Sequence, residues 1–322
     1  MVKRRIGQLR DSLLNAVFGF DLRANVAEFQ ASLERGATQR TLDEAWKEWL
    51  RDDRAQAREV LDSLVHRLEL QSQLLKSTRD NVPLLRYQLD SIRRTEEYAA
   101  ALHEPHPLVT VRIASYRNTE ALMDMAIASV MRQTYDNFEI VIVNDGPNER
   151  TRRAVEGLHD SRIRYEEFPA RARYPDDPHA RWMVAGSPGM NRGAELAAGA
   201  WIAPLDDDDE FTDDHLEVLV ALAREKGVEL AYGALTQKNL ANGEDHHIYS
   251  APPAISQFSF QGAIYLATLR SAFRYDEESW LVGEPGDWNL IRRMSAAGVT
   301  MASTPHVVAV MNQVPYTHKV PE

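Results

Sequence analysis

From residue 108 onward, short apolar segments alternate with segments of helical periodicity, and no other feature constrains the fold as tightly. The apolar segments are rich in β-branched residues, which is typical of buried strands. The expected strands are residues 108–114, 138–144, 162–168 and 201–205, and the expected helices are residues 120–132, 149–158 and 190–198. Repeated strand–helix–strand order predicts an α/β fold with a mainly parallel, Rossmann-like sheet and helices on both faces.

Polar clusters follow three of these strands. Ser115–Arg117 follows the first strand, Asn144–Gly146 the second, and Asp206–Asp209 the fourth. In open parallel sheets, ligands bind beyond the carboxyl ends of the strands. We therefore expect the three clusters to meet at one edge of the sheet and to form a single site.

The run Asp206–Asp209 carries the strongest chemical signal. Adjacent carboxylates repel one another, so holding several at one strand end is costly without a cation. Mg²⁺ and Mn²⁺ prefer oxygen ligands and often take one or two carboxylates plus substrate phosphates. The alternative is the solvated start of a helix, since Asp213 and Asp214 follow and acids favour a first helical turn. The apolar strand directly before the run favours the metal site.

Two other carboxylates each have two interpretations. Asp145, at a strand end, is able to accept hydrogen bonds from a ribose or a base. Asp-Gly-Pro is also good turn chemistry, and on its own the turn is preferred. Asp287 precedes a predicted helix over residues 288–297, where it either caps that helix or acts as a general base over an acceptor hydroxyl.

Residues 1–102 are predicted to be helical, and residues 103–107 read as the linker that opens an α/β domain over residues 103–322. An apolar seam from Leu61 to Ile92 steps in alternating threes and fours, the heptad spacing of a coiled coil. Asp80–Pro83 is expected to end one helix and begin the next, because proline fits a first helical turn. Heptads do not fix the partner, so the seam over residues 60–93 serves either a homo-oligomer or a helix pair folded onto the chain's own α/β domain.

Charge and cysteine content exclude several classes of binding partner and active site. Residues 1–105 hold 17 basic and 17 acidic side chains, so the whole net charge of −11 lies in the remainder. Such a surface would repel a phosphate backbone, and no nucleic-acid partner is expected. Without cysteine the chain has no disulfide, thiolate metal site or cysteine nucleophile, and it fits a reducing compartment.

The sequence predicts a cytoplasmic location. No stretch approaches the roughly 18 consecutive apolar residues that a membrane span requires, and Arg10 and Asp11 interrupt the place of a signal core. Apolar residues between Ile6 and Phe20 lie at helical spacing beside a basic end. A helix lying on the membrane surface, which would make the protein peripheral, is therefore an alternative to a helix packed on protein.

These motifs, in this order, resemble family 2 glycosyltransferases with the GT-A fold. Val109–Asn118 looks like the family's first strand and its Thr-Tyr-Asn-Arg-type loop. Ser129–Gly146 is similar to the family's helix, Gln-Thr-Tyr turn and second strand, and Asn191–Asp209 resembles the segment that ends in the Asp-x-Asp motif. The resemblance covers residues 108–319, about two thirds of the chain.

The resemblance implies a role for each matching position. Asp206 and Asp208 would be the Asp-x-Asp pair and hold Mn²⁺ or Mg²⁺, with His318 preferred over His306 as a further ligand. Asp287 would be the catalytic base. The residues implied to bind the nucleotide-sugar are Ala114, Ser115, Tyr116, Asp145, Asn191, Asp207 and Gly262.

The sequence departs from the family's pattern at several of these places. Asn144 replaces the more usual aspartate of the second-strand motif, and Gly286 replaces the first acid of an acidic pair before the base. Arg192 stands in for an arginine that many members carry two residues earlier. Residues 170–187 form an added loop, whose basic and aromatic side chains could bind a phosphate or an acceptor.

The implied activity is inverting transfer of a sugar from a nucleotide donor, by the family's habit a UDP-sugar, to a hydroxyl of a glycan or similar acceptor. The alternative is a non-catalytic oligomeric scaffold, or a nucleotide-sugar-binding protein with an inactive transferase domain. The presence of Asp206, Asp208 and Asp287 argues against that alternative.

Overall fold

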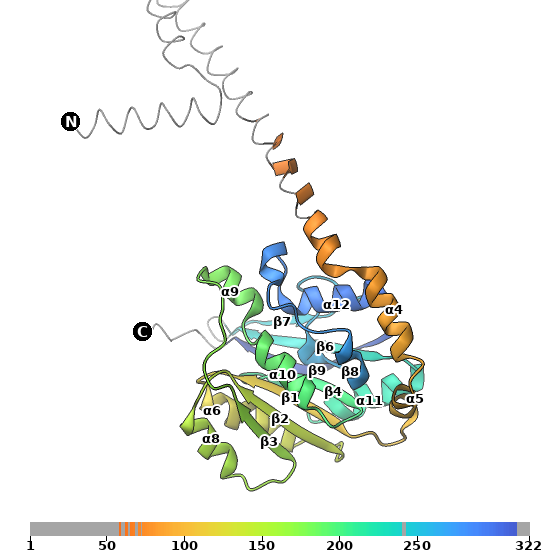
Figure 1. Cartoon of the computed structure of the whole chain (residues 1–322). Helices are drawn as coiled ribbons and strands as arrows, with labels where there is room; N and C mark the ends of the chain where they lie inside the picture. Colours follow the sequence, from red (N-terminus) through yellow and green to blue (C-terminus); the bar gives the residue numbers. More distant parts are fainter. Residues whose placement is uncertain are drawn as a thin grey trace, which may run out of the picture. The chain divides into compact units, whose positions relative to one another are not determined.

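A computed structural model describes residues 73–239 and 243–313, together with scattered positions between Arg58 and Gln71. The chain divides into two units between Lys76 and Ser77, and the second unit holds the whole sheet (Figure 1). The expected boundary at residue 103 differs from this division, since two helices before it belong to the sheet's unit. In the part of the chain that the structure describes, no helix combines the length and apolarity needed to cross a bilayer.

The elements, in chain order, are α4 (Val82–Ile92), α5 (Glu96–His103), β1 (Val109–Ser115), α6 (Thr119–Ala121), the π-helix η1 (Leu122–Ile127), α7 (Ala128–Met131), β2 (Phe138–Asn144), α8 (Glu149–Glu156), β3 (Ile163–Glu167), α9 (Pro178–Val184), α10 (Ser187–Leu196), β4 (Trp201–Asp206), β5 (Glu210–Phe211), α11 (His215–Lys226), β6 (Leu230–Asn239), β7 (Asp245–Ile248), β8 (Ala263–Leu266), α12 (Gly286–Ala297), β9 (Met301–Gln313) and the 3₁₀ helices η2 (Phe260–Gly262), η3 (Ala267–Ser271) and η4 (Ser279–Val282). All the strands and helices expected after residue 108 form, with bounds shifted by a few residues. The added loop before α10 contains the short helix α9.

The strands form one sheet in the order β3-β2-β1-β4-β8-β6-β9-β5, with β7 paired to β6. β3, β2, β1 and β4 are parallel to one another, whereas β8 runs antiparallel to both β4 and β6. The register aligns Ser115 with Asn144 and Ala114 with Asp206. The three polar clusters therefore meet at one edge of the sheet, as the parallel order predicts.

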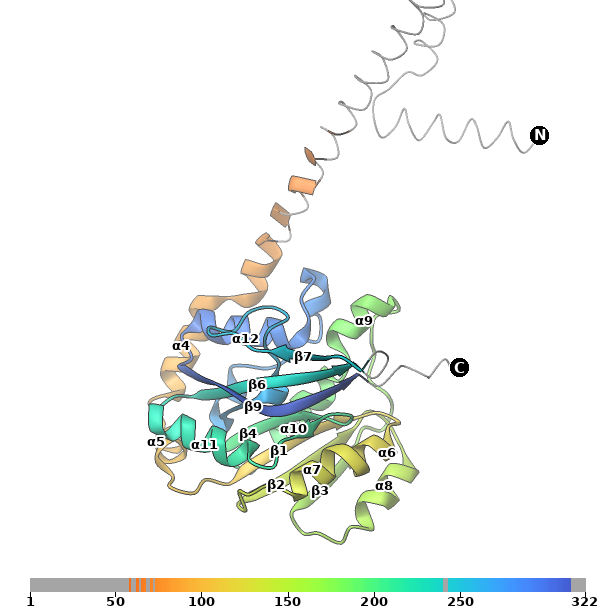
Figure 2. The ribbon, with the colours of Figure 1, turned by 180° about the vertical axis from the view of Figure 1, so that it is seen from behind.

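Helices cover both faces of this mainly parallel sheet (Figures 1 and 2). α10 packs on β1 and β2, while α11 packs on β6, β8 and β9. The close approach of α10 depends on its glycines. A Cβ atom at Gly193 would lie only 2.5 Å from Cγ of Arg112, and one at Gly189 would lie 3.3 Å from Cβ of Ala114. The small residues thus bring α10 directly onto the β1 strand that ends at the site.

α4 docks on the α/β domain through part of the heptad seam. Asn81 adopts a left-handed conformation (φ 41°) between a helical stretch and α4, and Pro83 lies in the first turn of α4, as predicted. Leu85 and Leu89 of the seam are buried, and α4 lies alongside α12 in both views (Figures 1 and 2). This part of the seam therefore packs within the chain. Several seam positions between residues 61 and 72 lie outside the described residues, so the homo-oligomer stays a prediction.

Replacing Leu89 with alanine is expected to lower the free energy of unfolding by about 2–5 kcal/mol, because a fully buried leucine leaves a cavity. Leu84, on the same helix but 46% exposed, provides the matched control, since its replacement by alanine should cost far less. Urea unfolding followed by circular dichroism measures both values. Equal effects for the two variants would contradict the docking of α4.

Candidate active site

Asp206–Asp209 form a tight turn between β4 and β5. Asp206 is the last residue of β4, and the backbone NH of Asp209 donates to the carbonyl of Asp206 at 3.4 Å. No helix begins here, because α11 starts only at His215. The alternative reading of the run as a solvated helix start is therefore wrong, and the acids lie at the edge of the sheet.

The carboxylate of Asp207 holds the loop after β1. It accepts hydrogen bonds from Oγ of Ser115 at 2.7 Å, the backbone NH of Tyr116 at 3.2 Å and Nδ2 of Asn118 at 3.3 Å. Ala114, opposite Asp206 in the sheet, is half-buried beside them. The structure thus brings Ala114, Ser115 and Tyr116 together with the acidic turn, where the sequence placed a nucleotide pocket.

Burial raises the pKa of every carboxyl group in the turn. It raises the pKa of Asp206 to about 7, with a second contribution from the charge of Asp287, and that of Asp207 to about 6. The pKa of Asp208 is also raised by burial, and that of Asp209 rises to about 9. Such shifts mean that the ionised turn is costly without a positive partner, because charges of one sign lie together in a poorly solvated place.

These residues fit a divalent cation that shares its coordination sphere with a substrate. The turn offers hard carboxylate oxygens, and no other described residue donates a hydrogen bond to the side chain of Asp208. Within the described residues, no three acidic or histidine side chains are grouped so as to hold a metal by themselves. Mg²⁺ commonly accepts such sites, in which one or two carboxylates are completed by phosphate oxygens and water.

Of the two histidines considered as metal ligands, the structure describes only His306. Nε2 of His306 lies 2.7 Å from Oδ2 of Asp214, on the exposed start of α11, so His306 has a carboxylate partner of its own. His318 lies outside the described residues. Its role as a metal ligand stays a prediction.

Asp287 lies in the first turn of α12 and accepts three hydrogen bonds from neighbouring segments. Oδ2 accepts from Oγ of Ser259 at 2.7 Å and from the backbone NH of Phe260 at 3.0 Å, and Oδ1 accepts from Oη of Tyr275 at 3.0 Å. Asp287 is not the N-cap, which is Pro285. A carboxylate has about four lone pairs, so one on Oδ1 stays open to a substrate hydroxyl.

Gln261 lies between Asp287 and the acidic turn. Its Nε2 donates to Oδ2 of Asp206, and its Oε1 contacts the hydroxyl of Ser259. That hydroxyl also reaches Asp287, but its single proton serves one acceptor at a time, and the charged carboxylate is the stronger one. Gly262, which follows Gln261, is buried beside Leu235 and the carbonyl of Gly233. The predicted base and the predicted metal ligand are therefore linked by the side-chain contacts of Ser259 and Gln261.

Asp145 follows β2 directly and accepts hydrogen bonds from the added loop. Its Oδ1 accepts from the backbone NH of Ala172 and its Oδ2 from Oη of Tyr174, both at 2.7 Å. Arg171 of the same loop lies 4.1 Å from the centre of the Tyr116 ring. The loop therefore lies against the predicted nucleotide pocket, and its Arg171 and Tyr174 belong to the site's surroundings.

Two residues of α10, Asn191 and Arg192, bond to neighbouring segments of the chain. Nδ2 of Asn191 donates to the carbonyl of Tyr275 at 3.0 Å, and its Oδ1 accepts from the Tyr275 NH at 2.9 Å. Arg192 pairs with Glu166 at 2.7 Å, so its guanidinium has an anion from the chain itself. Asn191 positions the segment that carries Tyr275, and its contact with a donor stays a prediction.

The structure gives Asp209 and Gly286 roles that the sequence did not predict. Asp209 is buried and accepts from the backbone NH of Asn312 at 2.8 Å, which ties the acidic turn to β9. Gly286 is also explained, since a Cβ atom there would lie 3.2 Å from Cδ1 of Tyr275 and 3.4 Å from the carbonyl of Met183. An acid at position 286 would crowd the phenol that holds Asp287.

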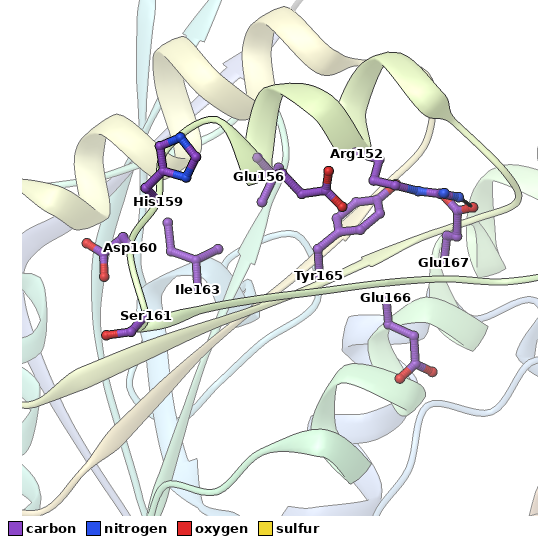
Figure 3. A pocket seen from close by; sticks show the side chains of 10 residues that line it. Arg152, Glu156, His159, Asp160, Ser161, Ile163, Tyr165, Glu166 and Glu167 are labelled. Carbon is purple, nitrogen blue, oxygen red and sulfur yellow. Dashed lines mark hydrogen bonds and ion pairs between the residues drawn. The ribbon is translucent and has the colours of Figure 1, made fainter.

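A hollow of about 640 Å³ lies apart from these residues, between α8 and β3 (Figure 3). It contains an ion pair, because Arg152 bonds to Glu167, which also accepts from Oη of Tyr165 at 3.1 Å. None of the predicted site residues lines it. The hollow is a feature of the sheet's outer edge and does not belong to the site.

Comparisons with known proteins agree with this arrangement. A family model described as glycosyl transferase family 2 matches residues 110–296, which span β1 to α12. A crystal structure of S. aureus TarS 1-349 in complex with UDP superimposes with a TM-score of 0.50 and 15% identity, covering 64% of this chain and 61% of that one. At this identity the likeness shows the fold alone.

Curated relatives match over a shorter part. A UDP-Glc:alpha-D-GlcNAc-diphosphoundecaprenol beta-1,3-glucosyltransferase, WfgD, of Escherichia coli is 30% identical over 131 residues, which are 39% of this chain and 45% of that protein. A GalNAc(5)-diNAcBac-PP-undecaprenol beta-1,3-glucosyltransferase of Campylobacter jejuni is 27% identical over 134 residues, which are 41% of this chain and 40% of that protein. The matches thus span less than half of these relatives.

Proposed function

Since this chain belongs to glycosyl transferase family 2, we propose that it is an inverting glycosyltransferase that moves a sugar from a nucleoside diphosphate to a hydroxyl acceptor. One observation carries the proposal. Asp287 is joined through Ser259 and Gln261 to Asp206, at the edge where the loop after β1 meets the acidic turn. A base and a diphosphate-facing acidic turn are the two parts that such a transfer needs.

In the proposed reaction Asp287 takes the proton of the acceptor hydroxyl, and the oxygen attacks the anomeric carbon of the donor sugar. The bond from that carbon to the diphosphate breaks on the opposite side, so the configuration inverts. The three donors to Asp287 hold its carboxylate in one orientation. Base and acceptor are thereby brought together in a fixed geometry, which lowers the entropic part of the barrier.

Asp206 and Asp208 are the residues that would hold Mn²⁺ or Mg²⁺. When bound, such a cation would supply positive charge against the departing diphosphate. Ala114, Ser115, Tyr116, Asp145 and Asp207 are proposed to line the nucleotide pocket. A UDP-sugar is the proposed donor, because the Escherichia coli relative is named for UDP-Glc.

The acceptor is proposed to be a hydroxyl group of a glycan or a glycan-like molecule. Both relatives are named for acceptors joined through diphosphate to undecaprenol, which supports a sugar hydroxyl at the end of a growing chain. We further propose that this protein is cytoplasmic and acts at a membrane surface. The arginines and aromatic residues of the segment from Ala170 to Ser187 are available for such an acceptor.

A thermal-shift screen of UDP-, GDP- and dTDP-sugars, with and without Mn²⁺, tests the proposal. A ligand that binds only the folded state at 100 times its Kd stabilises it by about 2.7 kcal/mol, so one donor series should raise Tm and do so more with Mn²⁺. The best donor is then incubated with simple glycosides to detect transfer. A chain that no nucleotide stabilises, with or without metal, would favour the non-catalytic scaffold.

A further inference from the structure

Arg112 is a buried cation that the proposed reaction does not yet use. It lies in the middle of β1, between Val111 and Ile113, and is only 1% exposed. Its Nε and Nη1 atoms have no hydrogen-bond partner among the described residues. Taking an arginine out of water costs several kcal/mol, and an apolar residue of similar volume avoids that cost. Stability alone therefore does not explain an arginine at this position.

Among the described residues, the Arg112 guanidinium makes one hydrogen bond, and it leads toward the site. Nη2 donates to Oη of Tyr275 at 3.4 Å, and the guanidinium lies 5.4 Å from the centre of the same ring. Arginine is only ever a donor, so the Tyr275 oxygen accepts this bond. The single proton of the phenol is then left for Oδ1 of Asp287, at 3.0 Å.

Tyr275 is itself held in place and keeps its proton. Asn191 bonds both the NH and the carbonyl of Tyr275, which fixes the backbone of the segment before α12. Burial, followed by the charge of Asp287, raises the pKa of Tyr275 well above its usual value. The phenol is therefore a donor to the carboxylate at neutral pH.

We propose that Arg112 and Tyr275 are positioning residues for the base, with Arg112 directing the Tyr275 proton onto Asp287. The phenol fixes the side of Oδ1 that faces the protein, and the remaining lone pair of that oxygen points to the acceptor hydroxyl. The buried positive charge of Arg112 also interacts electrostatically with the carboxylate of Asp206. This inference rests on the proposed function, in which Asp287 is the base.

Tyr275→Phe tests the inference in two backgrounds. In the otherwise native chain it should lower kcat about 10- to 100-fold, the range for one hydrogen bond to a charged group, while KM for the donor stays unchanged. In Asp287→Asn it should cause no further loss, because the phenol acts only through the carboxylate. Tyr265→Phe is the matched control, since Tyr265 is equally buried near Arg112 and should keep native kcat.

Arg112 variants separate positioning from support of the fold. Arg112→Met should lower kcat while its Tm is equal to or above the native value, because the buried charge is gone. Arg112→Lys keeps a donor and should recover part of the lost rate. A lower Tm with native kcat in Arg112→Met would make Arg112 a structural residue and overturn its assignment.

The outcomes distinguish the inference from the proposed function. If the native chain transfers sugar, Asp287→Asn does not, and Tyr275→Phe keeps native kcat, only the inference is wrong. The same holds if Tyr275→Phe reduces the residual rate of Asp287→Asn by an equal factor. If the native chain transfers no sugar from any nucleotide, the proposed function fails, and the inference fails with it.

Discussion

Replacing Asp287 with asparagine is expected to lower the rate of sugar transfer by about 10²- to 10⁴-fold, the usual contribution of a general base. Donor binding should survive, so the Tm increase with the best nucleotide-sugar should match that of the native chain. The reason is chemical, because an amide nitrogen has no basic lone pair to take the acceptor's proton.

The fold should tolerate this exchange. Ser259 and Phe260 both donate to Oδ2, so the single oxygen of asparagine can take that place. The amide NH₂ then faces Tyr275, whose hydroxyl oxygen can accept. A loss of rate with an unchanged Tm therefore reports on the chemistry and not on unfolding.

Glu278→Gln is the control for the Asp287 variant. Glu278 lies on the same segment before α12, but its side chain is 63% exposed and pairs with Arg79. The Glu278→Gln variant should transfer sugar at the native rate, because a surface ion pair contributes little to stability. Native activity in Asp287→Asn, measured by release of the nucleoside diphosphate, would show that the base lies elsewhere.

The sheet and its edge could be predicted because their signals are local. β2 is a seven-residue strand with five apolar residues, and it forms with the expected bounds. Once the parallel order is known, chain direction alone brings Ser115, Asn144 and Asp206 to one edge. Residues far apart in sequence thus converge without any knowledge of side-chain packing.

Contacts between side chains of distant segments could not be predicted in this way. Asp287 is held by Ser259, Phe260 and Tyr275, and no local pattern in the sequence pairs those segments. Asp145 is similar, since a loop of unknown path supplies Tyr174. One signal was present and unused, because Arg112 stands alone within the apolar run of β1. A charged residue in a buried strand predicts a nearby partner group, because an unpaired buried charge is costly.

The helical region shows the limit of periodicity. Heptad spacing continues through Leu85 and Leu89, but there the seam packs against the chain's own α12. The spacing describes an apolar stripe and carries no information on what covers it. Arg93 adds a specific contact, since it bonds to Glu229 at 2.7 Å. Burial tends to raise the pKa of Glu229, but the bond from Arg93 lowers it, and the pKa is depressed overall.

Replacing Asp208 with asparagine is expected to remove the Mn²⁺-dependent part of donor binding and to lower transfer by roughly 100-fold or more. This magnitude follows because a bound cation supplies several kcal/mol of charge stabilisation, and each 1.4 kcal/mol is worth about a factor of ten. The thermal shift with UDP should then be the same with and without Mn²⁺. Uridine, which has no phosphate, should show no Mn²⁺ effect in either protein.

The choice of Asp208 follows from its surroundings. Asp206 accepts from Gln261, and Asp207 accepts three hydrogen bonds from the loop after β1, so both have protein partners. Asp208 has none from another described residue, and burial raises its pKa. A cation would relieve the cost of keeping it ionised, and asparagine cannot replace that charge.

Asp213→Asn is the control for Asp208→Asn. Asp213 lies in the turn before α11, its side chain is 65% exposed, and it bonds to Arg132 at 3.2 Å. It should keep both the Mn²⁺ effect and the native rate. Two outcomes would contradict the assignment. Full transfer after removal of divalent cations with EDTA would exclude a metal role, and a Mn²⁺-dependent shift retained in Asp208→Asn would place the cation on other ligands.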